Sequence, residues 1–409
     1  METKPFKIGK WEIEQAWEQV KAKKGAAGVD GVTLERYEKY LGDNLYKVWN
    51  RMSSGSYFPQ PVRRVEIPKL DGGTRPLGIP TVEDRICQQV VKNRMEQELE
   101  PIFHEDSYGY RPGKSAHQAV KKCQERIYKT YWVLDLDVSK YFDSIDHEKL
   151  MRAVRKHVKE RWMLLYIERW LRAPIQYADG KQEESRQGTP QGGVISPILA
   201  NLYLHYTFDI WMNKHFPLLK FERYADDMVI HCFSRKQCEY LKVCLEKRFR
   251  ECGLILHPEK TKIVYCQQTN RTPQKGENSF KFLGFLFKPR RCKSKTGAIF
   301  SSFRAGVSPG SMMKVKDKIR EERIHSRQSA TMFDLARDLN PIIKGWLNYY
   351  AIISRHGINS FRRWMDFHLA KWIRKKHRLN TLRQAQERLL RIQRSQPGLF
   401  MHWQNNSTN

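Results

Sequence analysis

The spacing of apolar residues along the chain changes repeatedly and predicts alternating helices and short strands. An apolar stripe with lysines on the opposite side predicts an amphipathic helix over residues 8–24. The same period predicts further helices at 81–103, 148–171 and 235–252. Short apolar runs predict strands at 132–138 and 280–287, a hairpin around Asp71-Gly72-Gly73 within 59–80, and a second hairpin at 221–231.

Beyond a stretch rich in Gly, Ser and Lys at 273–311, the pattern becomes helical and very basic. Two series of large apolar residues, at 335–350 and 361–372, recur at helical spacing with Arg and Lys residues outside them. They predict a small helical bundle with an apolar core and a basic face suited to duplex phosphates. The stretch 273–311 is then a domain boundary, and residues 377–409, basic and then polar, are expected to fray.

Two adjacent aspartates, Asp226 and Asp227, lie at the tip of the second predicted hairpin. Adjacent carboxylates repel one another, so such a tip needs a compensating cation, and Mg²⁺ suits oxygen ligands and phosphate. A two-metal phosphoryl-transfer site needs a further carboxylate. The strand at 132–138 places Asp135 and Asp137 on one face, so one of these acids can reach a shared metal. Taken alone, the aspartate pair also fits an ordinary turn.

The composition narrows the class of partner. The 409 residues include 11 Trp and 19 Phe, which indicates folded domains with sizeable cores. Lys and Arg number 74 against 44 Asp and Glu, and this net charge of +30 favours a nucleic-acid partner. No apolar run approaches the roughly 20 residues of a membrane span. The N-terminus lacks a signal-peptide core, so a cytoplasmic protein is expected. The eight cysteines lack Cys-x-x-Cys spacing, which argues against zinc.

Other features fit nucleotide or nucleic-acid binding, and most also have a plainer explanation. Lys69 and Arg75 flank the first hairpin turn and can grip a triphosphate, or can be solvated charges. Small residues at 24–31 allow close approach of a nucleic-acid backbone, or form an ordinary loop. Phe142 can lie against a nucleotide sugar or pack in the core. Lys260 can protonate a pyrophosphate leaving group.

Residues 107–115 look superficially like a phosphate-binding P-loop. The glycine spacing is one residue short, however, and no buried strand leads into the segment. Arg111 and Lys114 are therefore expected to contact backbone phosphates of a template or primer. At 187–204 a Gly/Pro loop with exposed glutamines leads into a helix, a small flexible surface suited to a base pair and its sugar.

In this order, the motifs resemble the reverse transcriptases encoded by bacterial group II introns, over residues 10–375. The motifs that carry the resemblance are Ile67–Pro80, Ser107–Ser115, Val133–His147, Gln187–Leu204, Tyr224–Asp227, Gly253–Ile263, Phe282-Leu283-Gly284-Phe285 and Gly345-Trp346-Leu347-Asn348-Tyr349-Tyr350. Each motif alone is weak, and their joint order and spacing is specific. The segment Gln187-Gly188-Thr189-Pro190-Gln191-Gly192 with Tyr224–Asp227 is similar to the intron type and unlike the retron or diversity-generating types.

The resemblance implies an α+β right-hand polymerase with fingers, a palm built on an antiparallel sheet, and an α-helical thumb. It implies that Asp137, Asp226 and Asp227 are the metal ligands and catalytic carboxylates. Their cofactor would be two Mg²⁺ ions, with Mn²⁺ as a substitute. Lys260 would be the general acid of the reaction, which is RNA-templated DNA synthesis.

The resemblance also implies how the incoming nucleotide is held. Lys69 and Arg75 would bind its triphosphate, and Gln191 would contact the nucleotide itself. The carbonyl of Val138 would be a further metal ligand. Phe142 would be a steric gate that excludes a ribose 2′-hydroxyl.

The implied domains are an N-terminal extension at 1–58, fingers and palm at 59–290, a thumb or maturase domain at 291–376 and a tail at 377–409. Within the extension, residues 23–31 would clasp the template. The implied partners are an RNA template, which can be the protein's own intron RNA, a DNA or RNA primer, and deoxynucleoside triphosphates. The oligomeric state is left open.

The sequence departs from many intron enzymes because no paired cysteines follow the thumb, so an endonuclease domain and target-DNA cleavage are not expected. Three alternatives therefore stay open. One is a domesticated enzyme that acts in DNA repair or phage defence. Another is an RNA-binding maturase whose polymerase activity is not essential. A third is a defence polymerase that makes DNA with little or no template.

Overall fold

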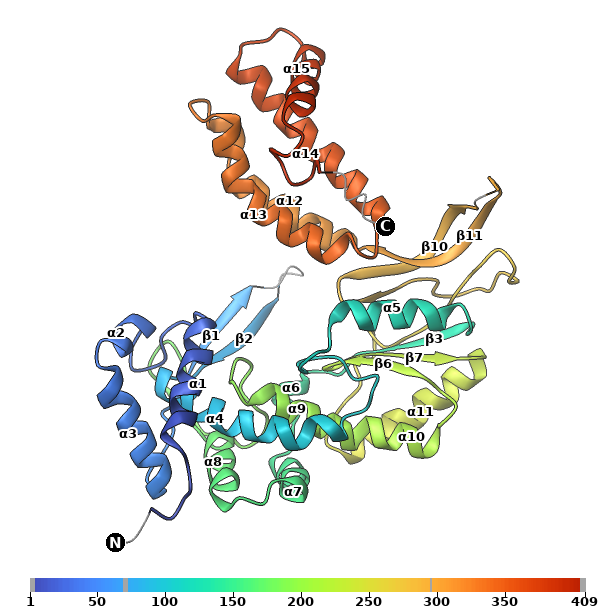
Figure 1. Cartoon of the computed structure of the whole chain (residues 1–409). Helices are drawn as coiled ribbons and strands as arrows, with labels where there is room; N and C mark the ends of the chain where they lie inside the picture. The colour runs from blue at the N-terminus through green and yellow to red at the C-terminus, as the bar shows by residue number, and fades with distance from the viewer. Residues whose placement is uncertain (1–3, 69–72, 295, 405–409) are drawn as a thin grey trace. The chain divides into compact units, whose positions relative to one another are not determined.

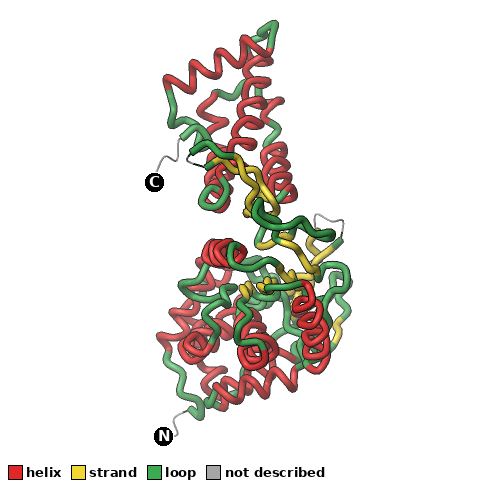
Figure 2. The backbone as a smooth tube through the Cα atoms, turned by 90° about the vertical axis from the view of Figure 1, so that its right-hand side faces the viewer, coloured by secondary structure: helices red, strands yellow, loops and turns green. Residues whose placement is uncertain are grey.

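The structure is a computed structural model that describes residues 4–68, 73–294 and 296–404. The chain divides into two compact units (Figure 1). The first comprises Met1–Ala119 and Leu134–Ile263, and the second comprises Val120–Val133 and Val264–Asn409. Both contain helices and strands, which agrees with the α+β class (Figure 2). None of the helices within the described ranges is long and apolar enough to cross a bilayer.

The first unit is mostly helical. The helices predicted at 8–24, 81–103 and 235–252 are confirmed, whereas the region predicted as helical at 148–171 is two helices separated by residues 158–160. The helical segments of this unit are α1 (Lys10–Ala22), α2 (Leu34–Glu38), α3 (Leu41–Ser54), α4 (Val82–Leu99), η1 (Glu100–Ile102), α6 (Tyr141–Ser144), α7 (His147–His157), α8 (Arg161–Leu171), α9 (Ser196–Leu204), η2 (His205–Asp209), α10 (Ile210–His215) and α11 (Arg235–Glu251). The predicted apolar stripe of α1 buries Ile13, Trp17 and Val20. The side chain of Thr81 caps α4 by accepting a hydrogen bond from the Asp84 amide.

Two sheets belong mainly to this unit. The first has the order β2-β1-β4-β5, with β1 (Val62–Pro68), β2 (Thr74–Ile79), β4 (Ile175–Gln176) and β5 (Gln182–Glu183). Strands β1 and β2 pair antiparallel from Arg63↔Ile79 to Pro68↔Thr74, which confirms the first predicted hairpin. The second sheet has the order β6-β7-β3-β8, with β6 (Phe221–Tyr224), β7 (Asp227–Cys232), β3 (Trp132–Leu136) and β8 (Lys262–Tyr265). It is the scaffold of the candidate site.

The second unit combines an antiparallel sheet with a helical bundle. Its elements are most of α5 (Ala116–Ile127), β9 (Phe280–Phe282), β10 (Phe285–Lys293), β11 (Ile299–Val307), α12 (Pro309–Glu321), η3 (Ile324–Ser326), α13 (Met332–Tyr350), α14 (Arg355–Lys376) and α15 (Leu382–Ser395). The single strand predicted at 280–287 is in fact two strands. Leu283 and Gly284 turn the chain between them with φ of 51° and 81°, and β9 and β10 pair antiparallel.

The compact units do not divide at the predicted domain boundaries. The chain passes between them at 263/264, whereas the fingers and palm were expected to end at residue 290. The predicted boundary stretch 273–311 is largely the sheet of β9, β10 and β11. The functional subdivision into fingers, palm and thumb at these residues stays a prediction.

The expectation that residues 377–409 fray is wrong for the described part of this segment. Thr381 caps α15 by accepting a hydrogen bond from the Gln384 amide, and Leu389 is buried. Phe400 and Trp403 enter the core of the helical bundle. The Trp403 Nε1–H donates to Asp366 Oδ1 at 2.8 Å. The short apolar run from Leu399 to Trp403 therefore helps to complete this core, although most of the segment around it is polar.

Replacing Phe400 with alanine is expected to destabilise the protein by about 3–5 kcal/mol, the usual effect of emptying a buried aromatic site. Phe400 is fully buried, whereas Phe333 on α13 is 63% exposed. Phe333→Ala is the matched control and is expected to change the free energy of unfolding little. Chemical denaturation of the full chain measures both variants. Equal small effects would mean that residues 397–404 do not pack as described.

Candidate active site

The aspartate pair lies at the tip of a tight hairpin. Strands β6 and β7 pair antiparallel up to Tyr224↔Asp227, so Ala225 and Asp226 form the two-residue loop. Such loops require positive φ angles, and Ala225 has φ of 56°. A left-handed conformation costs about 1–2 kcal/mol for a residue with a Cβ. The tip is therefore a strained turn. Asp227 follows it as the first residue of β7.

The third aspartate lies directly after β3, the strand next to β7 in the sheet. The main chain of Asp137 is fixed by the segment that follows α11, because the Asp137 carbonyl accepts a hydrogen bond from the His257 amide at 2.8 Å. Val138 is buried and forms an antiparallel bridge with Leu256. The neighbouring strands β3 and β7 thus carry carboxylates from distant parts of the sequence to one end of the sheet.

The carboxylates of this end influence each other electrostatically. Burial raises the pKa of Asp226, and the charge of Asp137 raises it further. Burial, followed by the charges of Asp227 and Asp137, raises the pKa of Asp135 to about 8. The ammonium of Lys260 lies 3.6 Å from Asp137 Oδ2. Crowded carboxylates, two of which have a raised pKa, fit a divalent cation, which would add positive charge among their oxygen atoms.

Two predicted nucleotide-binding residues contact each other beside this cluster. Arg75 Nε donates to Gln191 Oε1 at 2.7 Å, and Gln191 Nε2 donates to Asp143 Oδ1 at 3.4 Å. The charge of Arg75 also lowers the pKa of Asp226, against the larger effect of burial. Arg75 and Gln191 are therefore brought together toward the aspartates. Lys69, their predicted companion, lies outside the described residues.

The loop that carries Gln191 is docked by close backbone contacts. The Gly78 amide donates to the Gln191 carbonyl at 2.7 Å. Gly192 has φ of 119°, and a Cβ there would lie 2.5 Å from the Gly78 carbonyl oxygen. A glycine is required at this position for both reasons. The Gly/Pro loop that the sequence predicts is thus held in one position beside β2 by these backbone contacts.

Comparison with known protein families agrees with this geometry. Residues 67–287 match the family described as reverse transcriptase (RNA-dependent DNA polymerase), and residues 312–390 match the group II intron, maturase-specific domain. The chain belongs to the group II intron type of reverse transcriptases. It is an RNA-directed DNA polymerase with the right-hand polymerase fold, and enzymes of this class use divalent metal ions and copy an RNA template.

Individual relatives of this reverse transcriptase cover different shares of the chain. The group II intron-encoded protein LtrA of Lactococcus lactis is 26% identical over 89% of the chain and 72% of its own length. Protein YkfC of Escherichia coli is 38% identical over 46% of the chain and 50% of its own length. The putative COX1/OXI3 intron 2 protein of Saccharomyces cerevisiae is 31% identical over 66% of the chain and 30% of its own length.

Phe142 of the reverse transcriptase lies in α6, beside the Gln191 loop. The Thr189 amide donates to the Phe142 carbonyl at 2.8 Å. Phe142 is buried, and its ring packs against Tyr141 with centroids 5.4 Å apart. This burial fits the core-packing interpretation, and contact with a nucleotide sugar stays a prediction.

The expectation that Arg111 contacts nucleic-acid phosphates is wrong for this structure. Its side chain is 6% exposed and forms an ion pair with Glu100 at 2.7 Å. It also donates to the carbonyls of His104 and Ser107 at 2.6 and 2.7 Å. The guanidinium therefore stabilises the loop from 100 to 111. The Nζ atom of Lys114 donates a hydrogen bond to the Glu105 carbonyl at 2.8 Å.

The small residues of the segment 23–31 pack against protein. A Cβ on Gly28 would lie 2.7 Å from Thr81 Cα, and a Cβ on Gly25 would lie 2.0 Å from Arg85 Nη1. Arg85 Nη2 donates to the Ala26 carbonyl at 2.7 Å. The small residues therefore allow a close approach, as predicted, but the partner that approaches them is the start of α4. A role of this segment in clasping the template stays a prediction.

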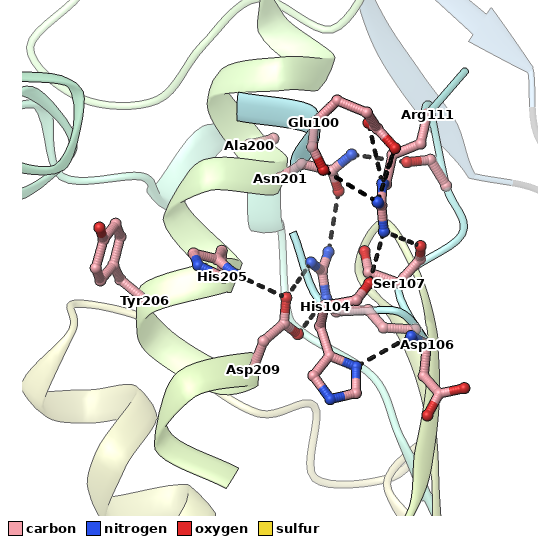
Figure 3. Close-up of polar contacts among 12 residues, drawn as sticks. Glu100, His104, Asp106, Ser107, Arg111, Ala200, Asn201, His205, Tyr206 and Asp209 are labelled. Atoms are coloured by element: carbon pink, nitrogen blue, oxygen red, sulfur yellow. Dashed lines mark hydrogen bonds and ion pairs between the residues drawn. The ribbon is translucent and has the colours of Figure 1, made fainter. Parts of the chain in front are cut away.

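Sequence reasoning missed a buried polar network beside the aspartate hairpin. Two of its members, Asn201 and Asp209, lie on the continuous helix α9–η2 (Figure 3). They bind Gly109 and Arg223 of β6 through hydrogen bonds. A charged residue just before an aspartate pair gives no sign in the sequence that its side chain is buried. The available signal was Asn201, a polar residue inside an otherwise apolar helix.

Proposed function

We propose that this reverse transcriptase extends a DNA or RNA primer on an RNA template at Asp137, Asp226 and Asp227, with deoxynucleoside triphosphates and two Mg²⁺ ions. The observation that carries the proposal is the sheet order, which puts Asp137 at the end of β3 beside β7, the strand that begins with Asp227 and follows Asp226 at the hairpin tip. The charge of Asp137 raises the pKa of Asp226, two carboxylates 89 positions apart in the sequence numbering. Carboxylates gathered in this way are the ligands that divalent ions take in phosphoryl-transfer sites.

The oxygen donors of this cluster suit Mg²⁺, with Mn²⁺ as a substitute of similar chemistry. The carbonyl of Val138, on the residue that follows Asp137, is proposed as an additional ligand. When bound, two such ions would lower the pKa of the primer 3′-hydroxyl and neutralise the triphosphate charge.

The remaining residues would position the nucleotide and complete the proton balance. Arg75, with Lys69, would bind the triphosphate through charge-assisted hydrogen bonds. Gln191 would exchange its contact with Arg75 for one with the nucleotide, and Phe142 would limit the space at its sugar. The primer 3′-hydroxyl would release its proton to solvent water as its oxygen bonds to the α-phosphorus, and the bond from that phosphorus to pyrophosphate breaks. Lys260 would transfer one proton to the departing pyrophosphate oxygen.

A second function, binding of intron RNA in support of splicing, is favoured by the maturase-domain match at 312–390. This region contains α13 and α14, whose outer positions carry many Arg and Lys residues. Such charge suits the phosphates of a folded RNA. The cognate RNA would be the protein's own intron, as the name of its relative LtrA, a group II intron-encoded protein, suggests.

Primer extension on an RNA template of defined sequence tests the proposed activity. With Mg²⁺ and all four deoxynucleoside triphosphates, we expect a full-length product that is complementary to the template. Chelation by EDTA should abolish the product, and added Mn²⁺ should restore it. Sequencing the product of a second, unrelated template is the control. A product whose sequence ignores the template would contradict RNA-templated synthesis and favour a defence polymerase.

A further inference from the structure

Arg223 lies two residues before the strained tip residue Ala225 and is completely buried. Its guanidinium forms a bidentate pair with Asp209, with Nε to Oδ1 at 2.8 Å and Nη2 to Oδ2 at 2.6 Å. Burial would raise the pKa of Asp209, but the charge of Arg223 and the nearby imidazole of His205, whose Nδ1 lies 3.5 Å from Asp209 Oδ2, hold that pKa below its usual value. Both partners are therefore ionised, inside the protein, beside the proposed catalytic hairpin.

The third guanidinium nitrogen reaches the hairpin itself. Arg223 Nη1 donates to Asn201 Oδ1 at 2.9 Å and to the Ala225 carbonyl at 3.2 Å. Asn201 is buried and comes from α9, four residues before His205 and eight before Asp209. This spacing places the three side chains on one helical face, as Figure 3 shows. One continuous helix thus fixes the Arg223 guanidinium, and this guanidinium in turn binds the Ala225 carbonyl at the hairpin tip.

The flank of the hairpin is fixed by a neighbouring segment. The Arg223 amide donates to the Asp106 carbonyl at 2.9 Å, and the Tyr108 amide donates to the Arg223 carbonyl at 2.8 Å. Asn201 Nδ2 donates to the Gly109 carbonyl at 2.7 Å. A Cβ on Gly109 would lie only 2.4 Å from the Ala225 nitrogen. The network therefore confines Ala225 from two sides.

Stability alone does not account for such a pair. Taking two charges out of water carries a large desolvation penalty, and a well-packed apolar pair of similar volume is often equally or more stable. What an apolar pair lacks is a directed donor for the Ala225 carbonyl. Because the next residue is Asp226, the orientation of that carbonyl is coupled to the direction of the Asp226 carboxylate.

We infer that Arg223 is a positioning residue for the reaction: its guanidinium, held by Asp209 and Asn201, fixes the Ala225 carbonyl and so aims Asp226 at the metal-binding cluster. The inference rests on the proposed site at Asp137, Asp226 and Asp227. The effect on rate is indirect, since the guanidinium is completely buried and its hydrogen bonds go to Asp209, Asn201 and the Ala225 carbonyl.

The test is the apolar double variant Arg223→Met with Asp209→Leu, in the full chain. It removes both charges, so its thermal midpoint is expected to stay close to that of the wild type. Its kcat for RNA-templated synthesis is expected to fall by about 10- to 100-fold, the usual effect of a misplaced catalytic group. The Mg²⁺ concentration for half-maximal rate should rise, whereas the KM for the nucleotide should change less.

A matched control is available in the same unit. Arg94 and Glu12 form another bidentate pair, at 2.7 and 2.9 Å, between α4 and α1. The double variant Arg94→Met with Glu12→Leu should keep the wild-type kcat and Mg²⁺ dependence. The conservative variant Arg223→Lys keeps the charge beside Asp209 but loses the fork of donors, so it should restore only part of the rate.

Unchanged kcat and Mg²⁺ dependence in the folded Arg223→Met, Asp209→Leu variant would overturn the inference. If that variant does not fold, Asn201→Leu replaces it, since this change leaves the Arg223–Asp209 pair in place. A reduced kcat at an unchanged thermal midpoint then supports positioning, and a wild-type kcat overturns it. Failure of the proposed site is distinguishable, because then Asp226→Asn would still synthesise DNA.

Discussion

Asp226→Asn is expected to lower the rate of RNA-templated DNA synthesis by about a thousandfold or more, the scale of losing a group that stabilises the transition state electrostatically. Asparagine has the same shape, but its amide oxygen lacks the charge that a divalent ion requires. Single-turnover primer extension at saturating nucleotide measures the chemical step directly. Retention of primer–template binding in a filter or anisotropy assay would show that the loss concerns catalysis.

The same substitution should leave the fold intact and stabilise it in EDTA. Because the pKa of Asp226 is raised in the folded state, the folded protein binds this proton more tightly than the unfolded chain. The contribution of Asp226 to stability therefore decreases as pH rises through its raised pKa, and a neutral asparagine escapes this loss. Asp179→Asn, at an exposed turn between β4 and β5, is the control and should alter neither rate nor stability. An active Asp226→Asn protein would refute the site.

Lys260→Ala is expected to reduce the single-turnover rate by about a hundredfold, at the lower end of the range for general acid catalysis. The ammonium lies 3.6 Å from Asp137 Oδ2 and is 60% exposed, so it can turn toward a bound pyrophosphate without a large rearrangement. Binding of primer–template should change little.

Lys242→Ala is the control for Lys260, since Lys242 pairs only loosely with Glu246 at 3.9 Å on α11. It should keep the wild-type rate and pH profile. A Lys260→Ala protein with the wild-type rate at all pH values would remove Lys260 from the mechanism. A loss that appears only in nucleotide KM would instead assign it a binding role.

Local pattern predicted the elements around the site well, because short strands and capped helices are encoded in nearby residues. The hairpin of β6 and β7 follows from apolar runs that flank an aspartate pair. Periodicity could not choose between Asp135 and Asp137, because alternate residues of a strand share a face. The resemblance to a family made that choice, and it stays a prediction. In the structure, the Asp137 carbonyl accepts a hydrogen bond from the His257 amide, and its carboxylate lies 3.6 Å from Lys260.

What the sequence could not predict depends on partners distant in the chain. Arg111 and Arg223 both lie in or beside motifs that look like loops in the sequence. In the structure both side chains are buried, and they form ion pairs with Glu100 and Asp209 respectively. Position 28 requires a glycine because Thr81, which is distant in the sequence, occupies the space that a side chain at position 28 would fill. The prediction for 377–404 was wrong for a related reason, since Phe400 and Trp403 lie in a run too short to predict packing, and most of their core is supplied by α13 and α14.

Anomalous diffraction from crystals grown with Mn²⁺, an RNA template annealed to a primer, and a non-hydrolysable nucleotide would locate the metal ions of the proposed site. We expect two anomalous peaks coordinated by carboxylate oxygens of Asp137, Asp226 and Asp227 and by the nucleotide phosphates. Peaks that Asp137 does not coordinate, or metal bound only at other carboxylates, would contradict this assignment.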